Sequence, residues 1–160
     1  MDVQKRNQLF SIVLGIIIII GLAYWLYQSI VGPYQEVIER EQMTERVRHQ
    51  MSNVREALIQ YERTNDEFPP TEGGLDSLVT FLKTDSAMIA NGDSLFKPLL
   101  PNVSYNPDSL IYSPRPPHPK FEYTLNDTLR PQIYLLKDPA TDDQIGSLEK
   151  TTRLNSGNWE

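Results

Sequence analysis

The chain has 160 residues, a formal net charge of −6 and no cysteine. Without cysteine it cannot form disulfides, thiolate nucleophiles or cysteine-based metal sites. Residues 32–160 carry 20 of the 21 acidic residues and 13 of the 15 basic residues, and this acidic surplus argues against nucleic acid as a partner.

A membrane helix is predicted near the N-terminus. Residues 9–31 form an apolar run of 23 residues without a charge. As an α-helix this run would be roughly 35 Å long, which suffices to cross a hydrocarbon core of about 30 Å. A cleaved signal peptide is the alternative, but its apolar region is normally about 7–15 residues long and ends at small residues. We therefore expect a short cytoplasmic tail over residues 1–8 and a retained single-pass helix in a lipid bilayer over residues 9–31.

The positive charges around this run favour a cytoplasmic N-terminus. Lys5 and Arg6 lie just before the run, whereas Arg40 and Arg46 follow it at a greater distance. The two counts are equal, but the N-terminal pair is closer to the run and denser. We therefore place residues 32–160 outside the cytoplasm.

An amphipathic helix is predicted over residues 32–66. Its apolar residues follow a 4-3-4-3 spacing, which places them in one stripe: Val47, Met51, Val54, Leu58 and Tyr61. Such a stripe can dock on the chain's own domain or on a partner helix, and the spacing alone leaves both open. The helix should end near Asn65, because Pro69 and Pro70 cannot continue it.

A short second helix is predicted after this corner. Thr71 is the predicted N-cap, and Glu72 lies in the positively polarised first turn. Apolar residues at i, i+3, i+4 and i+7 then form the buried stripe of the helix: Leu75, Leu78, Val79 and Leu82. Residues 83–107 are predicted to be a connecting region with one helical turn around residues 86–90.

Beyond residue 107 the pattern changes to short apolar runs that turn residues bound. Three of these runs, 110–113, 121–125 and 132–137, are predicted to be antiparallel strands. The segment 145–154 can add an edge strand. The predicted fold class is therefore α+β, with a domain over residues 67–160 in which helices pack on one face of a small antiparallel sheet.

One stretch at the corner between the two helices has a distinctive register. It places the following residues in order: Ala57-Leu58, Tyr61, Asn65, Phe68-Pro69, Thr71-Glu72, Gly74-Leu75 and Leu78-Val79. In this register the chain resembles type IV pilin-like proteins, and more narrowly the major (G-type) pseudopilins of type II secretion systems. The resemblance implies a pilin-like fold, anchored in the bacterial inner membrane with a periplasmic domain. It also implies a non-enzymatic function in an envelope secretion or filament apparatus, by association with other protein subunits.

The N-terminal run departs from that family's pattern in two ways. Precursors of the family carry a glycine before a processed start and a glutamate inside the apolar run. Here residues 1–8 contain no glycine and residues 9–31 contain no glutamate. The departure favours an alternative function, in which the chain is an accessory structural subunit of another bacterial membrane complex and keeps its anchor uncleaved.

The resemblance also suggests calcium, because major pseudopilins bind calcium in a loop of the sheet region. This chain offers Asp138, Asp142 and Asp143 in one loop, and oxygen-rich loops suit calcium. The alternative is a solvated acidic turn that caps a hairpin.

The sequence gives no sign of catalysis. His49 and His118 have neither a serine–acid partner nor a second metal ligand at the usual spacing. Gly73-Gly74 lacks the lysine and the preceding strand of a phosphate-binding loop. We therefore expect no enzyme, no cofactor apart from calcium at the acidic loop, and no small-molecule substrate.

Overall fold

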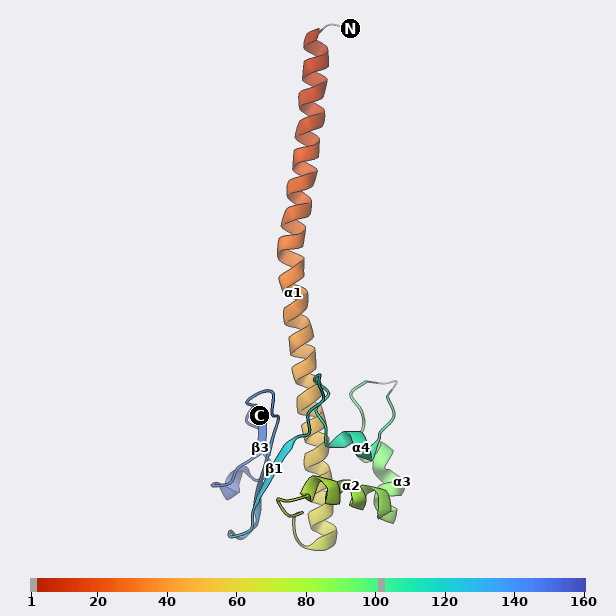
Figure 1. Ribbon diagram of the computed structural model, residues 1–160, viewed down its shortest axis with the longest axis vertical. Coiled ribbons are helices and arrows are strands. Elements are labelled where there is room, and N and C mark those ends of the chain that lie inside the picture. Colours follow the sequence, from red (N-terminus) through yellow and green to blue (C-terminus); the bar gives the residue numbers. More distant parts are fainter. Residues whose placement is uncertain (1–2, 101–102) are drawn as a thin grey trace. The chain divides into compact units, whose positions relative to one another are not determined.

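The computed structural model describes residues 3–100 and 103–160 (Figure 1). Its helices are α1 (Val3–Asn65), α2 (Gly74–Thr84), α3 (Ser86–Leu95), α4 (Pro107–Leu110) and the 3-10 helix η1 (Thr151–Arg153). Its strands are β1 (Glu122–Asn126), β2 (Ile133–Lys137) and β3 (Gln144–Gly146). These elements confirm the predicted α+β layout. The chain forms two compact units, Met1–Gln42 and Met43–Glu160, and α1 contributes residues to both.

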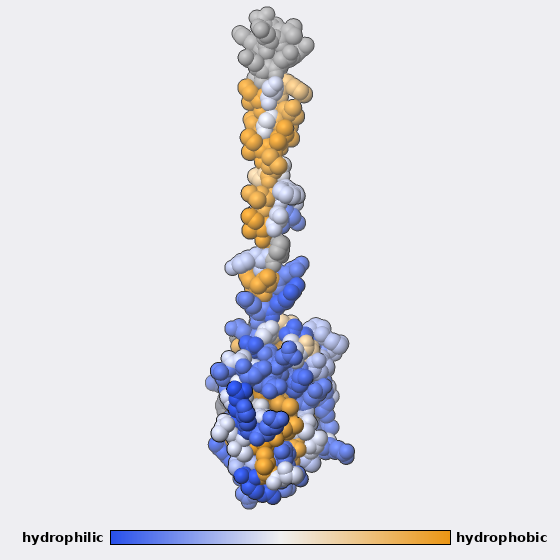
Figure 2. All heavy atoms as spheres, turned by 90° about the vertical axis from the view of Figure 1, so that its left-hand side faces the viewer, coloured by the Kyte–Doolittle hydropathy of each residue, from blue (hydrophilic) through white to orange (hydrophobic). Residues whose placement is uncertain are grey.

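The N-terminal unit exposes its apolar side chains. Every large hydrophobic residue between residues 10 and 30 is exposed, with exposed fractions of 46–69%, and Figure 2 shows the apolar surface along this segment. Such exposure is unfavourable in water and normal for a helix in lipid. Among the residues that the structure describes, α1 is the one helix long and apolar enough to cross a membrane, judged by length and composition.

The apolar stripe of the amphipathic segment lies at the centre of the second unit. The following residues of α1 have no exposed surface: Val47, Met51, Val54 and Leu58. They belong to the same hydrophobic cluster as Leu78 of α2 and Leu136 of β2. In Figure 1 the strands lie to one side of this part of α1, and α3 and α4 to the other. The stripe therefore docks on the chain's own domain, which was the first of the two alternatives.

The sheet is antiparallel, with strand order β1-β2-β3. In its register Tyr123 pairs with Leu136, and Leu136 pairs with Ile145. All three side chains belong to the hydrophobic core. The strands predicted at 121–125 and 132–137 are confirmed as β1 and β2.

The strand predicted at 110–113 was wrong. Helix α4 occupies its start, and Tyr112 forms only an isolated bridge with Lys120. The reason is local capping. The Asn106 side chain accepts a hydrogen bond from the backbone N–H two residues on, and Pro107 has the fixed φ of a first helical turn.

Two further predictions were right in kind and wrong in extent. The helical turn predicted at 86–90 continues to residue 95 as α3, and the Asp85 side chain caps its start by accepting hydrogen bonds from two backbone N–H groups. The edge strand predicted at 145–154 is the shorter β3, after which the chain forms η1.

The corner between α1 and α2 also differs from the prediction in one detail. Helix α1 ends at Asn65 as predicted, but α2 begins at Gly74 and is not capped by Thr71. The Thr71 hydroxyl instead accepts a hydrogen bond from the Leu125 N–H (2.9 Å) and so ties the corner to β1. Gly73 makes the turn into α2 with a φ of 67°, a left-handed conformation that glycine adopts without strain.

Tyr123 of β1 closes the same corner from the other side. Its hydroxyl donates a hydrogen bond to the Pro69 carbonyl oxygen (2.8 Å). Its ring lies so close to Gly74 that a Cβ at that position would approach it to 3.1 Å. Burial raises the pKa of the Tyr123 phenol far above its ordinary value. Residues of the corner between α1 and α2 therefore contribute to the packing of this domain.

Candidate functional site

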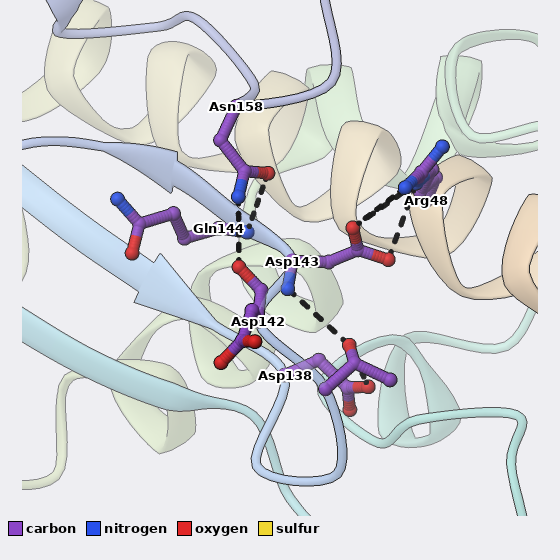
Figure 3. Close-up of polar contacts among 7 residues, drawn as sticks. Arg48, Asp138, Asp142, Asp143, Gln144 and Asn158 are labelled. Carbon is purple, nitrogen blue, oxygen red and sulfur yellow. Dashed lines mark hydrogen bonds and ion pairs between the residues drawn. The ribbon is translucent and has the colours of Figure 1, made fainter.

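The turn between β2 and β3 holds the three acidic residues singled out in the sequence (Figure 3). The backbone closes the turn, because the Asp138 N–H donates to the Asp143 carbonyl oxygen (3.0 Å). The Thr141 N–H donates to the Asp138 carbonyl oxygen (3.4 Å) and tightens the turn further. The fold thus fixes the backbone from which all three carboxylates project.

Asp138 is the fully buried member of the three. Its side chain has no exposed surface, and its Oδ2 accepts a hydrogen bond from the Thr141 hydroxyl (2.8 Å). Its Oδ1 is buried and has no hydrogen-bond partner among the described residues. Buried polar atoms are normally satisfied, so this oxygen is the one atom of the described turn that departs from the rule.

Asp143 is held by an arginine of α1. The Arg48 Nη2 donates to Asp143 Oδ1 (2.8 Å), and the Arg48 Nε lies 3.2 Å from both carboxylate oxygens. The guanidinium carbon also lies 5.1 Å from the centre of the Trp159 ring, a cation–π distance. A planar guanidinium suits this two-pronged geometry, and the pair ties the turn to α1 across 95 positions of sequence.

Asp142 points away from the other two. Its side chain is exposed, and Figure 3 shows its carboxylate on the opposite side of the turn from that of Asp143. Its backbone carbonyl oxygen accepts a hydrogen bond from the Asn158 amide (2.8 Å). Within residues 3–100 and 103–160, no group of three or more histidine, aspartate or glutamate side chains is arranged to hold a metal ion. Calcium at this turn stays a prediction, and the ion would compete with Arg48 for Asp143.

A second arginine of α1 lies one heptad further along and holds residues 155–160. The Arg55 Nη1 donates to the Glu160 carboxylate (2.9 Å) and to the Asn155 carbonyl oxygen (3.0 Å). The hydrogen bond from Arg55, followed by one from the Gly157 N–H, lowers the pKa of Glu160 below its ordinary value of 4.5. Two arginines of one helix thus hold two segments from the far end of the chain.

Sequence reasoning missed these arginines and their partners. Arg48 and Arg55 lie on the polar side of the amphipathic helix, where a charge is normally solvated. The signal in the sequence was their spacing of seven, which places both on the same side of α1. The two histidines are not at this site. His49 Nε2 bonds the Lys97 carbonyl oxygen (2.7 Å), and His118 Nδ1 bonds the Ser113 carbonyl oxygen (3.1 Å).

Comparisons of the chain with protein families, with curated proteins and with solved structures found no match. The likeness to pseudopilins therefore rests on the sequence register around Asn65. The function has to be argued from the geometry of the chain itself.

Proposed function

We propose that this chain is a non-enzymatic, membrane-anchored structural subunit with a pseudopilin-like exported domain. It acts by association with other protein subunits, in an envelope secretion or filament apparatus. One observation carries the proposal: between residues 10 and 30 α1 is uncharged and exposes every large hydrophobic side chain, and the same helix contributes residues around Met51 to the core of the second unit. A helix with both properties couples a folded domain to a lipid bilayer.

Further support comes from the part of α1 between the apolar run and the buried stripe. Tyr34 and Val37 lie three residues apart and so share one side of α1, and they are 66% and 49% exposed. These two large apolar side chains of the N-terminal unit therefore form an uncovered seam. An uncovered apolar seam on a helix is the kind of surface that a partner helix buries.

Photo-cross-linking in native membranes tests association at this seam. A photoreactive amino acid at Tyr34 or Val37 should give adducts with other protein subunits, whose identity mass spectrometry then provides. The matched control is Gln35, which is exposed and lies about 100° further round the helix. Equal yields at Gln35 and Tyr34, or no adducts at either, would contradict association through this seam.

The proposed topology has the N-terminus in the cytoplasm and the domain in the periplasm. The supporting observation is the pair Lys5 and Arg6 directly before the apolar run. Fusions at the C-terminus test it, because a reporter active only in the periplasm should work there. Activity of a cytoplasm-only reporter at the same position would reverse the topology.

The second candidate is an accessory subunit of another bacterial membrane complex, with a permanent anchor. The missing glycine in residues 1–8 and the missing glutamate in residues 9–31 favour it. The intact mass of the protein extracted from membranes separates the two candidates. Loss of the first residues with a methylated new N-terminus supports a processed pseudopilin, and a full-length chain supports the accessory subunit.

A further inference from the structure

The outer edge of β3 is covered by residues 155–160 of the same chain, which we call the strap. Strand β3 pairs with β2 on one side only. On its other side the Gly146 N–H donates to the Ser156 carbonyl oxygen, and the Asn158 N–H donates to the Gln144 carbonyl oxygen (3.0 Å each). The strap thus runs antiparallel to β3, with Gly157 opposite Ile145.

The side chain of Asn158 adds two bonds to this cover (Figure 3). Its Oδ1 accepts a hydrogen bond from the Gln144 N–H (3.1 Å), and its Nδ2 donates to the Asp142 carbonyl oxygen (2.8 Å). The backbone groups at Gln144 that an open edge would present are therefore occupied. Open edges are templates for pairing with another chain, and proteins often cover them with a loop.

The side-chain contacts between the strap and α1 are weak. One further contact reaches the sheet, because the hydroxyl of the buried Tyr134 donates a hydrogen bond to Asn155 Oδ1 (2.9 Å). Side chains of the Arg55–Glu160 pair are 25% and 43% exposed, and ion pairs of this kind contribute little in water. Of the strap's side chains, Trp159 is the one that packs against the hydrophobic core. The strap can therefore leave β3 without opening the sheet beneath it.

An edge opened in this way is complementary to itself. Gln144 and Gly146 lie on either side of Ile145, and their backbone groups point outward from the sheet. In the closed state these groups bond the strap, and once the strap has left they would be free. Two copies of β3 placed antiparallel about Ile145 would each satisfy the other, as a two-fold interface requires. Charged side chains on an edge strand usually discourage its pairing with another chain, and the residues of β3 carry no charge.

We propose that residues 155–160 are a releasable strap over the edge of β3, and that opening the strap lets β3 pair with β3 of a second copy of this chain. The inference does not depend on the secretion function proposed above. It concerns a contact between copies that any membrane subunit of this fold could use.

The full chain in detergent micelles provides the test. Arg55→Glu should open the strap by repulsion from Glu160, whereas Arg55→Glu/Glu160→Arg restores the pair in reverse. Light scattering should give twice the wild-type protein mass for Arg55→Glu and the wild-type mass for the double variant. Exchange of the Gly146 amide hydrogen in dilute Arg55→Glu should be about fivefold faster than in wild type, and should slow as the concentration rises.

Two more variants make every outcome decisive. Asn158→Pro removes the N–H that bonds the Gln144 carbonyl oxygen and leaves α1 unchanged, so it should behave like Arg55→Glu even if that variant does not fold. Gln144→Lys added to Arg55→Glu charges the edge and should return the mass to that of wild type. Wild-type mass in both opened variants would overturn the proposal, as would a doubled mass that persists with Gln144→Lys.

Discussion

Gly146 shows how narrowly single residues are constrained at the end of β3. Its φ is 86°, and a Cβ there would lie 2.1 Å from the Tyr134 carbonyl oxygen. Gly146→Ala should therefore reduce the free energy of unfolding by about 2–4 kcal/mol, through backbone strain and displacement of β2. Gly73→Ala is the matched control, because its φ is 67° but no atom lies within 4 Å of the added Cβ. It should cost only about 1 kcal/mol.

This difference can be measured by unfolding both glycine variants of the full chain in urea. Near-ultraviolet circular dichroism monitors the unfolding. Equal losses at the two positions would mean that the close approach to Tyr134 does not contribute.

Arg48 would compete with calcium at the acidic turn, where calcium binding is a prediction. In the present arrangement its guanidinium occupies both oxygens of Asp143, while Oδ1 of the buried Asp138 has no partner among the described residues. Arg48→Gln should release Asp143 and tighten calcium binding on the order of tenfold, since ligand charge sets calcium affinity. Calorimetry of the full chain with calcium measures the change, and Asp138→Asn in the same background should abolish it. No heat in any of these proteins would remove the calcium site.

Among the elements, the strap has a pH dependence that follows from Glu160. Hydrogen bonds from Arg55 and the Gly157 N–H depress the pKa of this carboxyl below 4.5 in the folded chain. A depressed pKa means that the stabilisation is complete above the unfolded-state value and is lost as the pH falls through the folded-state value. The strap should therefore loosen below about pH 4.5.

Fluorescence of Trp159 reports this loosening, because the ring lies beneath Arg48 and against the core. Trp25→Phe removes the other tryptophan and leaves a single probe. The transition that accompanies a fall in pH below the ordinary carboxyl pKa of 4.5 should vanish in Glu160→Gln. A transition of the same size in that variant would assign it to another carboxyl.

Elements with a strong periodic pattern were predictable from the sequence. The stripe through Met51 and Leu58 gave the buried side of α1, since an apolar 4-3-4-3 spacing has one helical interpretation. The prolines at Pro69 and Pro70 gave the end of the helix. The run at 110–113 misled because three apolar residues carry little periodic information, and the Asn106 cap decided its structure locally.

The candidate site was predictable only in part, for a different physical reason. The acidic turn is visible because its carboxylates are neighbours in sequence. Its anchor is not, because the partners of Arg48 and Arg55 lie 95 and 105 positions away. The spacing of seven places the two arginines on one side of α1, but which of many charges they meet depends on the finished fold.

On the scale of the whole molecule, the two units of the chain differ in how far they expose their apolar residues. The unit from Met43 to Glu160 buries most of its large apolar residues in one cluster, to which α1 contributes. The segment between residues 10 and 30 exposes its apolar residues on all sides of the same helix. A charge added between residues 10 and 30 should therefore affect membrane association. A charge added to an exposed site of the unit from Met43 to Glu160 should not.

Ile18 and Ile19 provide the first kind of site. They lie near the middle of residues 9–31 and are 52% and 67% exposed. An arginine at the centre of a membrane helix costs about 2.5–3.5 kcal/mol on insertion scales, so Ile18→Arg/Ile19→Arg should largely prevent insertion. Alkaline carbonate should then extract the double variant, whereas wild type stays in the membrane pellet. Ile89→Arg is the matched control, because Ile89 is a 65% exposed isoleucine of α3, and this variant should stay in the pellet. If the double variant stays in the pellet as well, a part of the chain outside residues 9–31 holds it at the membrane.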